Sequence, residues 1–187
     1  MKRQIRIIGI DDGPFDKKNK GLNVLVVGTI FRGGDFMDGL VSCYVKQDGT
    51  DATRKIALMI NNSKFKPQLQ FIFIDGIAVG GFNIINIKEL SEKTGLPVIN
   101  IIRDYPDYKK FFKAMDKAGK LRYKSIIEEL EKPVKVNNVY VQYEKINIKD
   151  VKELLKITCT HSNVPEPLRI AHLIATGVVD GESRGRS

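Results

Sequence analysis

The chain has 187 residues, a length typical of one domain built around a single hydrophobic core. Hydrophobic residues make up 42% of the sequence, which excludes wholesale disorder. The net charge is +9, and charge alone does not separate its two interpretations. One is a polyanionic partner, nucleic acid first, and the other is a lysine-rich surface that keeps the protein soluble.

The apolar runs are too short to cross a bilayer, and no secretory leader opens the chain. We therefore expect a soluble, cytoplasmic protein that does not bind membranes. Cys43 and Cys159 are far apart and lack a CxxC spacing, which argues against a disulfide framework and against a zinc site. The sequence leaves a homo-oligomer open.

Strand-like segments come first along the chain. Residues 4–10, 21–33 and 38–49 are rich in Val and Ile and are bounded by turn residues, so they predict three antiparallel strands. Residues 51–62 then change to helical spacing, with Asp51 placed as the N-cap.

Strands and helices alternate after residue 62. We expect strands at 68–75, 96–102 and 137–142, helices at 83–95, 106–118, 120–131, 148–158 and 165–177, and a basic tail from about residue 177. This order predicts one α/β domain over residues 1–187. Its mixed sheet would be antiparallel first and parallel afterwards, with flanking helices. The ribonuclease H-like fold has this order.

Five carboxylates fall where such a sheet brings segments together. Asp11 and Asp12 end the first strand, and Asp75 ends the fourth. Asp48 and Asp51 lie between the third strand and the first helix. Carboxylates that meet at one sheet edge repel one another unless a cation intervenes. Mg²⁺ or Mn²⁺ takes such oxygen ligands, and two ions about 3.5–4 Å apart support phosphodiester cleavage.

Each of these acids also has a purely structural interpretation. Asp-Gly steps begin at Asp12, Asp48 and Asp75 and are common in turns, while Asp51 suits a helix cap. Spacing alone leaves both interpretations open.

The segment "FIFIDGIAVGGFNIINIKELSEKTGLPVINIIRD" at 71–104 resembles the core of endonuclease V, in which an apolar strand ends in Asp-Gly and a Gly-rich loop leads into a helix. "IRIIGID" at 5–11 is similar to the strand with its first catalytic Asp, and "PEPLRIAH" at 165–172 to its C-terminal element. Over nearly its whole length the chain resembles an archaeal protein family related to endonuclease V, which shares "GIDDGPF", "DGTDAT" and "GESRGR".

The resemblance implies a ribonuclease H-like, endonuclease V-like domain with a magnesium-type acidic centre. By position, Asp11 and Asp75 match the metal ligands of the first and fourth strands. Asp51 lies near a glutamate of endonuclease V, and Asp48 competes with it for that role. Arg103 stands where endonuclease V carries a lysine, so a cation that faces substrate phosphate is kept.

The chain also departs from endonuclease V. The segment "FRGGDFMDG" lacks the Tyr-Pro wedge that opens DNA beside a lesion, and "GFN" at 81–83 replaces an "HPR". The late catalytic His of endonuclease V corresponds best to Glu144, which becomes a candidate catalytic residue. The resemblance therefore implies the fold and the acidic centre more directly than it implies cleavage at a deaminated base.

Basic residues concentrate in the segment 103–135, which holds ten Lys or Arg. Lys109 and Lys113 of this segment, together with Arg169, are candidates for binding substrate, and nearby tyrosines could stack on bases. The alternative for the segment is a solvated helix face. His172 has the apolar spacing of the last helix, which favours packing over a catalytic role.

These features predict a Mg²⁺- or Mn²⁺-dependent hydrolase of nucleic acid phosphodiester bonds. Two alternatives stay open: a nucleic acid-binding protein that lost catalysis, and a hydrolase or transferase for a small phosphorylated metabolite. The predicted catalytic residues are Asp11, Asp51, Asp75 and Glu144, the metal ligands Asp11, Asp12, Asp48, Asp51 and Asp75, and the substrate contacts Arg103, Lys109, Lys113 and Arg169.

Overall fold

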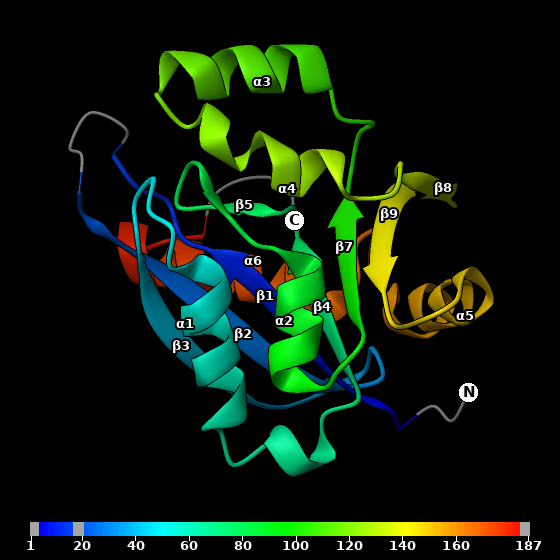
Figure 1. Ribbon diagram of the computed structural model, residues 1–187. Helices are drawn as coiled ribbons and strands as arrows, with labels where there is room; N and C mark the ends of the chain where they lie inside the picture. Colours follow the sequence, from blue (N-terminus) through cyan, green and yellow to red (C-terminus); the bar gives the residue numbers. More distant parts are fainter. Residues whose placement is uncertain (1–3, 17–20, 184–187) are drawn as a thin grey trace.

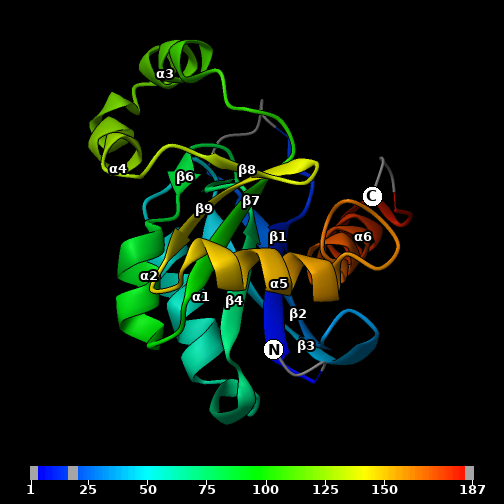
Figure 2. The same ribbon diagram turned by 90° about the vertical axis from the view of Figure 1, so that its right-hand side faces the viewer.

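The computed structural model describes residues 4–16 and 21–183 of the chain. A seven-stranded mixed sheet forms its centre, with strand order β3-β2-β1-β4-β7-β9-β8 (Figure 1). Helices lie on both faces of this sheet (Figure 2). The strands of the sheet are β1 (Arg6–Asp12), β2 (Asn23–Arg32), β3 (Phe36–Lys46), β4 (Phe71–Asp75), β7 (Val98–Ile102), β8 (Val134–Val136) and β9 (Val139–Glu144).

The predicted α/β class and its mixed sheet are confirmed. β1 pairs with β2 and β2 with β3, each antiparallel, whereas β1 pairs with β4 and β4 with β7 in parallel. The C-terminal ends of β1, β4 and β7 therefore meet at one edge of the sheet.

The last part of the sheet differs from the prediction. β9 runs antiparallel to β7, not parallel, and it forms a hairpin with β8, a strand that the sequence did not predict. The two strands are joined by Asn137, whose φ of 53° is tolerated by Asn better than by most residues. This Asn-Asn turn reverses the chain within two residues and so makes β9 antiparallel to β8.

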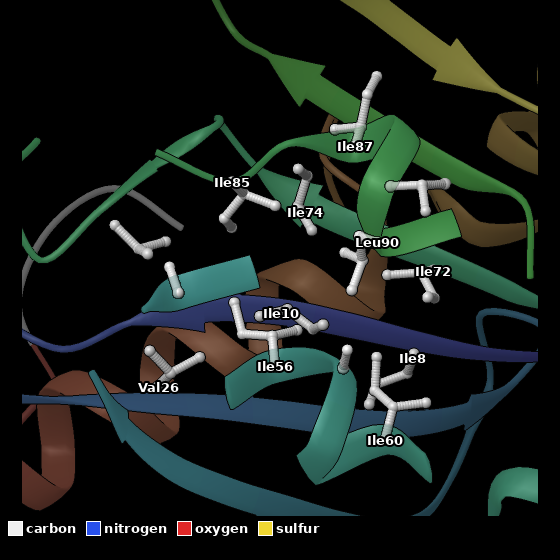
Figure 3. Close-up of a cluster of buried hydrophobic side chains, with 14 of the residues drawn as sticks. Ile8, Ile10, Val26, Ile56, Ile60, Ile72, Ile74, Ile85, Ile87 and Leu90 are labelled. Atoms are coloured by element: carbon white, nitrogen blue, oxygen red, sulfur yellow. The ribbon is translucent and has the colours of Figure 1, made fainter. Parts of the chain in front are cut away.

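Two helices cover each face of the sheet. α1 (Ala52–Asn61) and α2 (Ile87–Thr94) lie on one face, and α5 (Ile148–Thr158) and α6 (Glu166–Asp180) on the other. Because side chains alternate along a strand, β1 sends Ile8 and Ile10 into the first core and Ile7 into the second. Figure 3 shows Ile8 and Ile10 among the side chains of the first core.

The predicted helix at 83–95 begins later than expected. Residues Asn83–Ile84 form a short strand, β6, which pairs with β5 (Ala78–Val79). The helix itself starts after Asn86, whose side chain accepts a hydrogen bond from the backbone N–H of Glu89. An N-cap residue has non-helical backbone angles, and those of Asn86 are extended, so the helix begins only after it.

The basic segment forms two helices that project beyond the C-terminal end of β7 (Figure 1). The first is α3 (Tyr108–Lys117), and the predicted helix at 120–131 is reduced to a 3₁₀ turn at Leu121–Tyr123 and the short α4 (Lys124–Glu128). Another 3₁₀ turn, Lys66–Gln68, precedes β4. Aromatic side chains of this segment, including Phe111 and Phe112, pack around Met115.

The C-terminal helix α6 lies against β1 and β2. A side chain at Gly9 would collide with Pro167, because a Cβ placed there lies 2.4 Å from the backbone of Pro167. The helix runs to Asp180 and is closed by Gly181, so the tail predicted from about residue 177 starts later. Residues 184–187 of that tail lie outside the described residues. Within the described chain, no helix is long and apolar enough to cross a membrane.

Candidate active site

The main candidate site is a pocket of about 470 Å³ at the C-terminal ends of β1 and β4, which we call the acid pocket. Ile10 pairs with Ile74 in parallel register, so Asp11 and Asp75 come next to each other at the strand ends. The acid pocket is lined by Asp11, Asp12, Gly13, Pro14, Asp75, Gly76, Ile101, Ile102, Arg103, His172 and Thr176.

Asp11 is buried and held from two sides. Its Oδ1 accepts a hydrogen bond of 2.9 Å from the backbone N–H of Asp12, and its Oδ2 lies 2.8 Å from Nδ1 of His172. His172 belongs to α6, which packs closely against β1 because Gly9 has no side chain to collide with Pro167. Helix packing thus brings a histidine from the far end of the chain onto the first acid.

Asp75 is partly buried and lies beside a cation. Nη2 of Arg103 donates a hydrogen bond of 3.0 Å to its Oδ2. The pKa of Asp75 is raised from 3.8 to about 6, first because burial disfavours the charged carboxylate and second because Asp11 is close and negative. Arg103 and His172 oppose this rise.

Asp12 points to the opposite face of the sheet, because side chains alternate along β1. Its Oδ2 accepts a hydrogen bond of 2.8 Å from the backbone N–H of Gly80, and it also lines a second pocket together with Asp48. Burial raises its pKa from 3.8 to about 7, and the charge of Asp11 adds to the rise. The pKa of Asp12 thus lies well above that of an ordinary aspartate.

Asp51 does not line the acid pocket. Its Oδ1 accepts hydrogen bonds from the backbone N–H of Lys46 and from Nδ2 of Asn83, and its Oδ2 lies 3.1 Å from Nζ of Lys55. Burial would raise its pKa, but these hydrogen bonds outweigh burial and lower it. The side chain makes no cap bond to α1; instead, Oδ1 of Asn83 accepts from the N–H of Ala52.

Asp48 is likewise engaged in its own loop. It has a φ of 50°, and its Oδ1 accepts a hydrogen bond of 2.8 Å from the N–H of Phe82. The structure therefore brings together Asp11, Asp12 and Asp75 in the acid pocket and leaves Asp48 and Asp51 outside its lining.

Glu144 lies at the other end of the sheet from these acids. It pairs with Val98, at the start of β7, whereas Asp75 pairs with Ile101 near the end of β7. The antiparallel direction of β9 is the reason, because a parallel strand would have ended beside Arg103. Glu144 contributes to a separate pocket and is not among the residues that line the acid pocket.

The basic candidates have different surroundings. Arg103 lines the acid pocket. Lys109 and Lys113 are exposed on α3 and are not part of that pocket. Arg169 makes two hydrogen bonds of 2.8 Å to the buried carboxylate of Glu166, so its guanidinium is committed to a structural ion pair.

His172 is the functional candidate that sequence reasoning missed. Its spacing matched the buried stripe of α6, and the sequence predicted a packing role. The signal that would have found it is the end of "PEPLRIAH", where the His falls one helical turn after Arg169 on a helix that crosses β1.

The donors of the acid pocket fit a hard divalent cation. In the part of the chain that the structure describes, no three or more His, Cys, Asp or Glu side chains are grouped so as to hold a metal ion by themselves. Mg²⁺ commonly binds through only one or two carboxylates and fills its shell with water and substrate phosphate. Asp11 and Asp75, adjacent at the strand ends and with a raised pKa on Asp75, meet this requirement.

Comparison with known proteins places the chain in a family. The sequence profile described as endonuclease dU matches residues 3–179. The chain belongs to the endonuclease dU family. Its relatives include a UPF0215 protein of Methanosarcina acetivorans, which is 44% identical over 194 residues that cover 100% of this chain and 97% of the relative. A UPF0215 protein of Methanopyrus kandleri is 41% identical over 98% of this chain and 95% of its own length.

Solved structures resemble this endonuclease dU family member over most of its length. A protein of Archaeoglobus fulgidus superposes with a TM-score of 0.86 at 32% identity, over 94% of this chain and 98% of that chain. Ciona intestinalis endonuclease V was solved with a 24mer DNA containing an inosine followed by a ribo-adenosine. It superposes with a TM-score of 0.58 at 13% identity, over 89% of this chain and 82% of that chain. That likeness shows a shared fold.

Proposed function

We propose that this protein is a divalent-metal-dependent endonuclease that cleaves a phosphodiester bond of DNA. The observation that supports it most is the convergence of Asp11, Asp75, Arg103 and His172 in one pocket at the ends of adjacent strands. The family description, endonuclease dU, points to a deoxyuridine-containing strand as the substrate. The DNA in the complex of Ciona endonuclease V agrees with a nucleic acid partner.

Asp11 and Asp75 would hold the cation, Mg²⁺ or Mn²⁺. When bound, such an ion neutralises the two carboxylates, lowers the pKa of a bound water and stabilises charge on the scissile phosphate. Arg103, at the rim and next to Asp75, would pair with a non-bridging phosphate oxygen. Its 42% exposed side chain can turn from the carboxylate toward a substrate.

His172 and Asp12 would act around this pair. The imidazole at 2.8 Å from Asp11 orients that carboxylate and can move a proton at its ring nitrogens. Asp12, with a pKa of about 7, can exchange a proton near neutral pH. Asp48, Asp51 and Glu144 have no role in this arrangement, because none of them lines the acid pocket.

An end-labelled oligonucleotide with a single deoxyuridine tests the proposal. The protein should nick it in Mg²⁺ or Mn²⁺, fail to nick it in EDTA, and lose the activity in Asp75→Asn. Asp51→Asn is the matched control, since it removes an acid of the same type that lies outside the acid pocket. Undiminished cleavage in EDTA, or by Asp75→Asn, would contradict the metal site. Tight binding of the same DNA without cleavage would favour a non-catalytic binding protein.

A further inference from the structure

The segment that joins β7 to α3, residues 103–107, carries an exposed aromatic ring beside the acid pocket. Arg103, its first residue, lines that pocket, and Tyr105 follows two positions later and is 52% exposed. Two residues span at most about 7 Å, so the backbone of Tyr105 lies within that distance of the backbone of Arg103. The segment leaves the sheet at the C-terminal end of β7 (Figure 1), the end at which Asp11 and Asp75 also lie.

Neighbouring rings hold Tyr105 in place. Its ring meets that of Tyr140 at 77° with 5.3 Å between the centroids, and that of Tyr108 at 90° with 6.4 Å between the centroids. Such perpendicular arrangements are favourable for aromatic pairs. Pro106 restricts the backbone of Tyr105 to extended conformations. A flat group that stacks on this ring therefore binds a side chain that is already ordered and that loses little conformational freedom.

The other two tyrosines of the basic segment 103–135 are used for packing. Tyr108 and Tyr123 are half-buried and pack against the cluster around Met115. Tyr105 is outside that cluster and is the exposed one of the three. A single exposed ring needs no function in itself. What distinguishes Tyr105 is that its ring is both held by neighbours and placed next to the acid pocket.

The charges around Tyr105 fit a nucleic acid strand that offers a base to the ring and phosphates to either side of it. Asp104 and Asp107 flank the ring, and their carboxylates repel phosphate. Cations lie beyond these acids: Arg103 on the side of the acid pocket, and Lys109, which is exposed, in the first turn of α3. The neutral ring between the two acids suits a base, and the outer cations suit the phosphates.

We propose that Tyr105 is a stacking platform for one unpaired base of the DNA strand that enters the acid pocket. This inference rests on the proposed function, because a phosphodiester of the same strand must reach Asp11 and Asp75. Every base has a π-face, so the contact tolerates any sequence. It requires a base that has left the stack of its neighbours. Tyr105 therefore favours single-stranded or locally opened DNA over an intact duplex.

The affinity for single-stranded DNA tests this contact without any contribution from catalysis. Fluorescence anisotropy in EDTA measures the binding of a labelled single strand that contains one deoxyuridine. Tyr105→Ala should weaken binding at least about fivefold, the lower end of what one stacked base contributes. Tyr105→Phe should bind as the unmodified protein does, because the ring and not the hydroxyl makes the contact. Phe36→Ala is the matched control, since Phe36 is 57% exposed and lies at the opposite end of the sheet from Asp11.

The sequence contains no tryptophan, which allows a direct measurement of stacking. Tyr105→Trp introduces a single indole beside the acid pocket, and Phe36→Trp introduces one at the opposite end of the sheet. A base that stacks on an indole quenches its fluorescence. Titration with the single strand should quench Tyr105→Trp to a plateau and leave Phe36→Trp unchanged. A strand of tetrahydrofuran abasic sites has the same phosphates without bases, and it should quench neither variant.

Cleavage in Mg²⁺ distinguishes this inference from the proposed function. The stacking role is overturned by undiminished affinity of Tyr105→Ala, by an equal loss in Phe36→Ala, or by no measurable binding of the single strand. It is also overturned if the bound strand leaves Tyr105→Trp unquenched or if the abasic strand quenches it. Each of these results, together with metal-dependent cleavage, would leave the nuclease intact. Quenching by the base-containing strand without any cleavage would support the stacking platform while the proposed nuclease activity fails.

Discussion

Two acidic regions of this molecule resemble each other in sequence and differ in the surroundings of their carboxylates. Asp11 and Asp75 lie in the acid pocket, where burial and mutual repulsion raise the pKa of Asp75 to about 6. Asp51 lies in the loop before α1, where hydrogen bonds from Lys46, Asn83 and Lys55 overcome burial and lower its pKa. An acid surrounded by donors is already satisfied, whereas buried acids with few donors leave a charge for a cation to neutralise.

The largest difference between the two regions is expected in catalysis. Asp11→Asn and Asp75→Asn should each lower the rate of metal-dependent DNA cleavage by at least about a hundredfold, since even partners of metal ligands commonly change activity 10–100-fold. Asp51→Asn should change the rate little. Single-turnover cleavage of a deoxyuridine strand measures all three, and a loss in Asp51→Asn equal to that in Asp75→Asn would erase the distinction.

His172 should give the next largest effect. His172→Ala removes the imidazole that lies 2.8 Å from Asp11 and should slow cleavage about 10–100-fold. The same change at His161 is the control, because that side chain is 70% exposed and contacts Glu166 rather than the acid pocket. Comparable rates for His172→Ala and the unmodified protein would remove the histidine from the site.

Asp51, in the loop before α1, should matter for stability rather than for catalysis. Asp51→Ala leaves the N–H of Lys46 and the amide of Asn83 without their acceptor, so unfolding free energy should fall by roughly 1–3 kcal/mol. Urea denaturation in EDTA measures this loss. An Asp51→Ala protein as stable as the parent would show that the hydrogen bonds in this loop contribute nothing.

The smallest expected difference between the two regions is in how stability depends on pH. Between pH 4 and about 7 the folded chain keeps protons on Asp75 and Asp12 that the unfolded chain has lost, so rising pH lowers the metal-free stability through these two groups. Bound Mn²⁺ needs ionised carboxylates, so stabilisation by Mn²⁺ should grow from pH 5.5 to pH 8. Thermal melts across this range, with and without Mn²⁺, measure both slopes, and a Mn²⁺ effect independent of pH would contradict the ligand assignment.

The parts of the structure set by local pattern were predictable. Continuous runs of apolar residues located β1 and β4, and the end of each strand located Asp11 and Asp75. Strand alternation also carries information that the sequence prediction did not use. It places Asp11 on the face of α6 and Asp12 on the opposite face, so the two acids have different hydrogen-bond partners, His172 and Gly80.

The parts set by distant contacts were not predictable from local pattern. Asp51 accepts a hydrogen bond from Asn83, which is 32 residues away, and no residue near Asp51 in the sequence indicates that partner. His172 reaches Asp11 across 161 residues because Gly9 lets α6 approach β1. The antiparallel pairing of β9 with β7, which removes Glu144 from the acid pocket, is a contact between strands far apart in the chain.

The most direct test of the central claim is the shift in melting temperature caused by Mn²⁺ in three proteins at pH 8. The parent and Asp51→Asn should both be stabilised, because a ligand that binds only the folded state raises its stability in proportion to its affinity. Asp75→Asn should be at least as stable as the parent without metal, since relief from burying a charge opposes loss of the pair with Arg103, and should gain little from Mn²⁺. Equal Mn²⁺ shifts in Asp75→Asn and the parent would contradict the claim that Asp75 holds the ion.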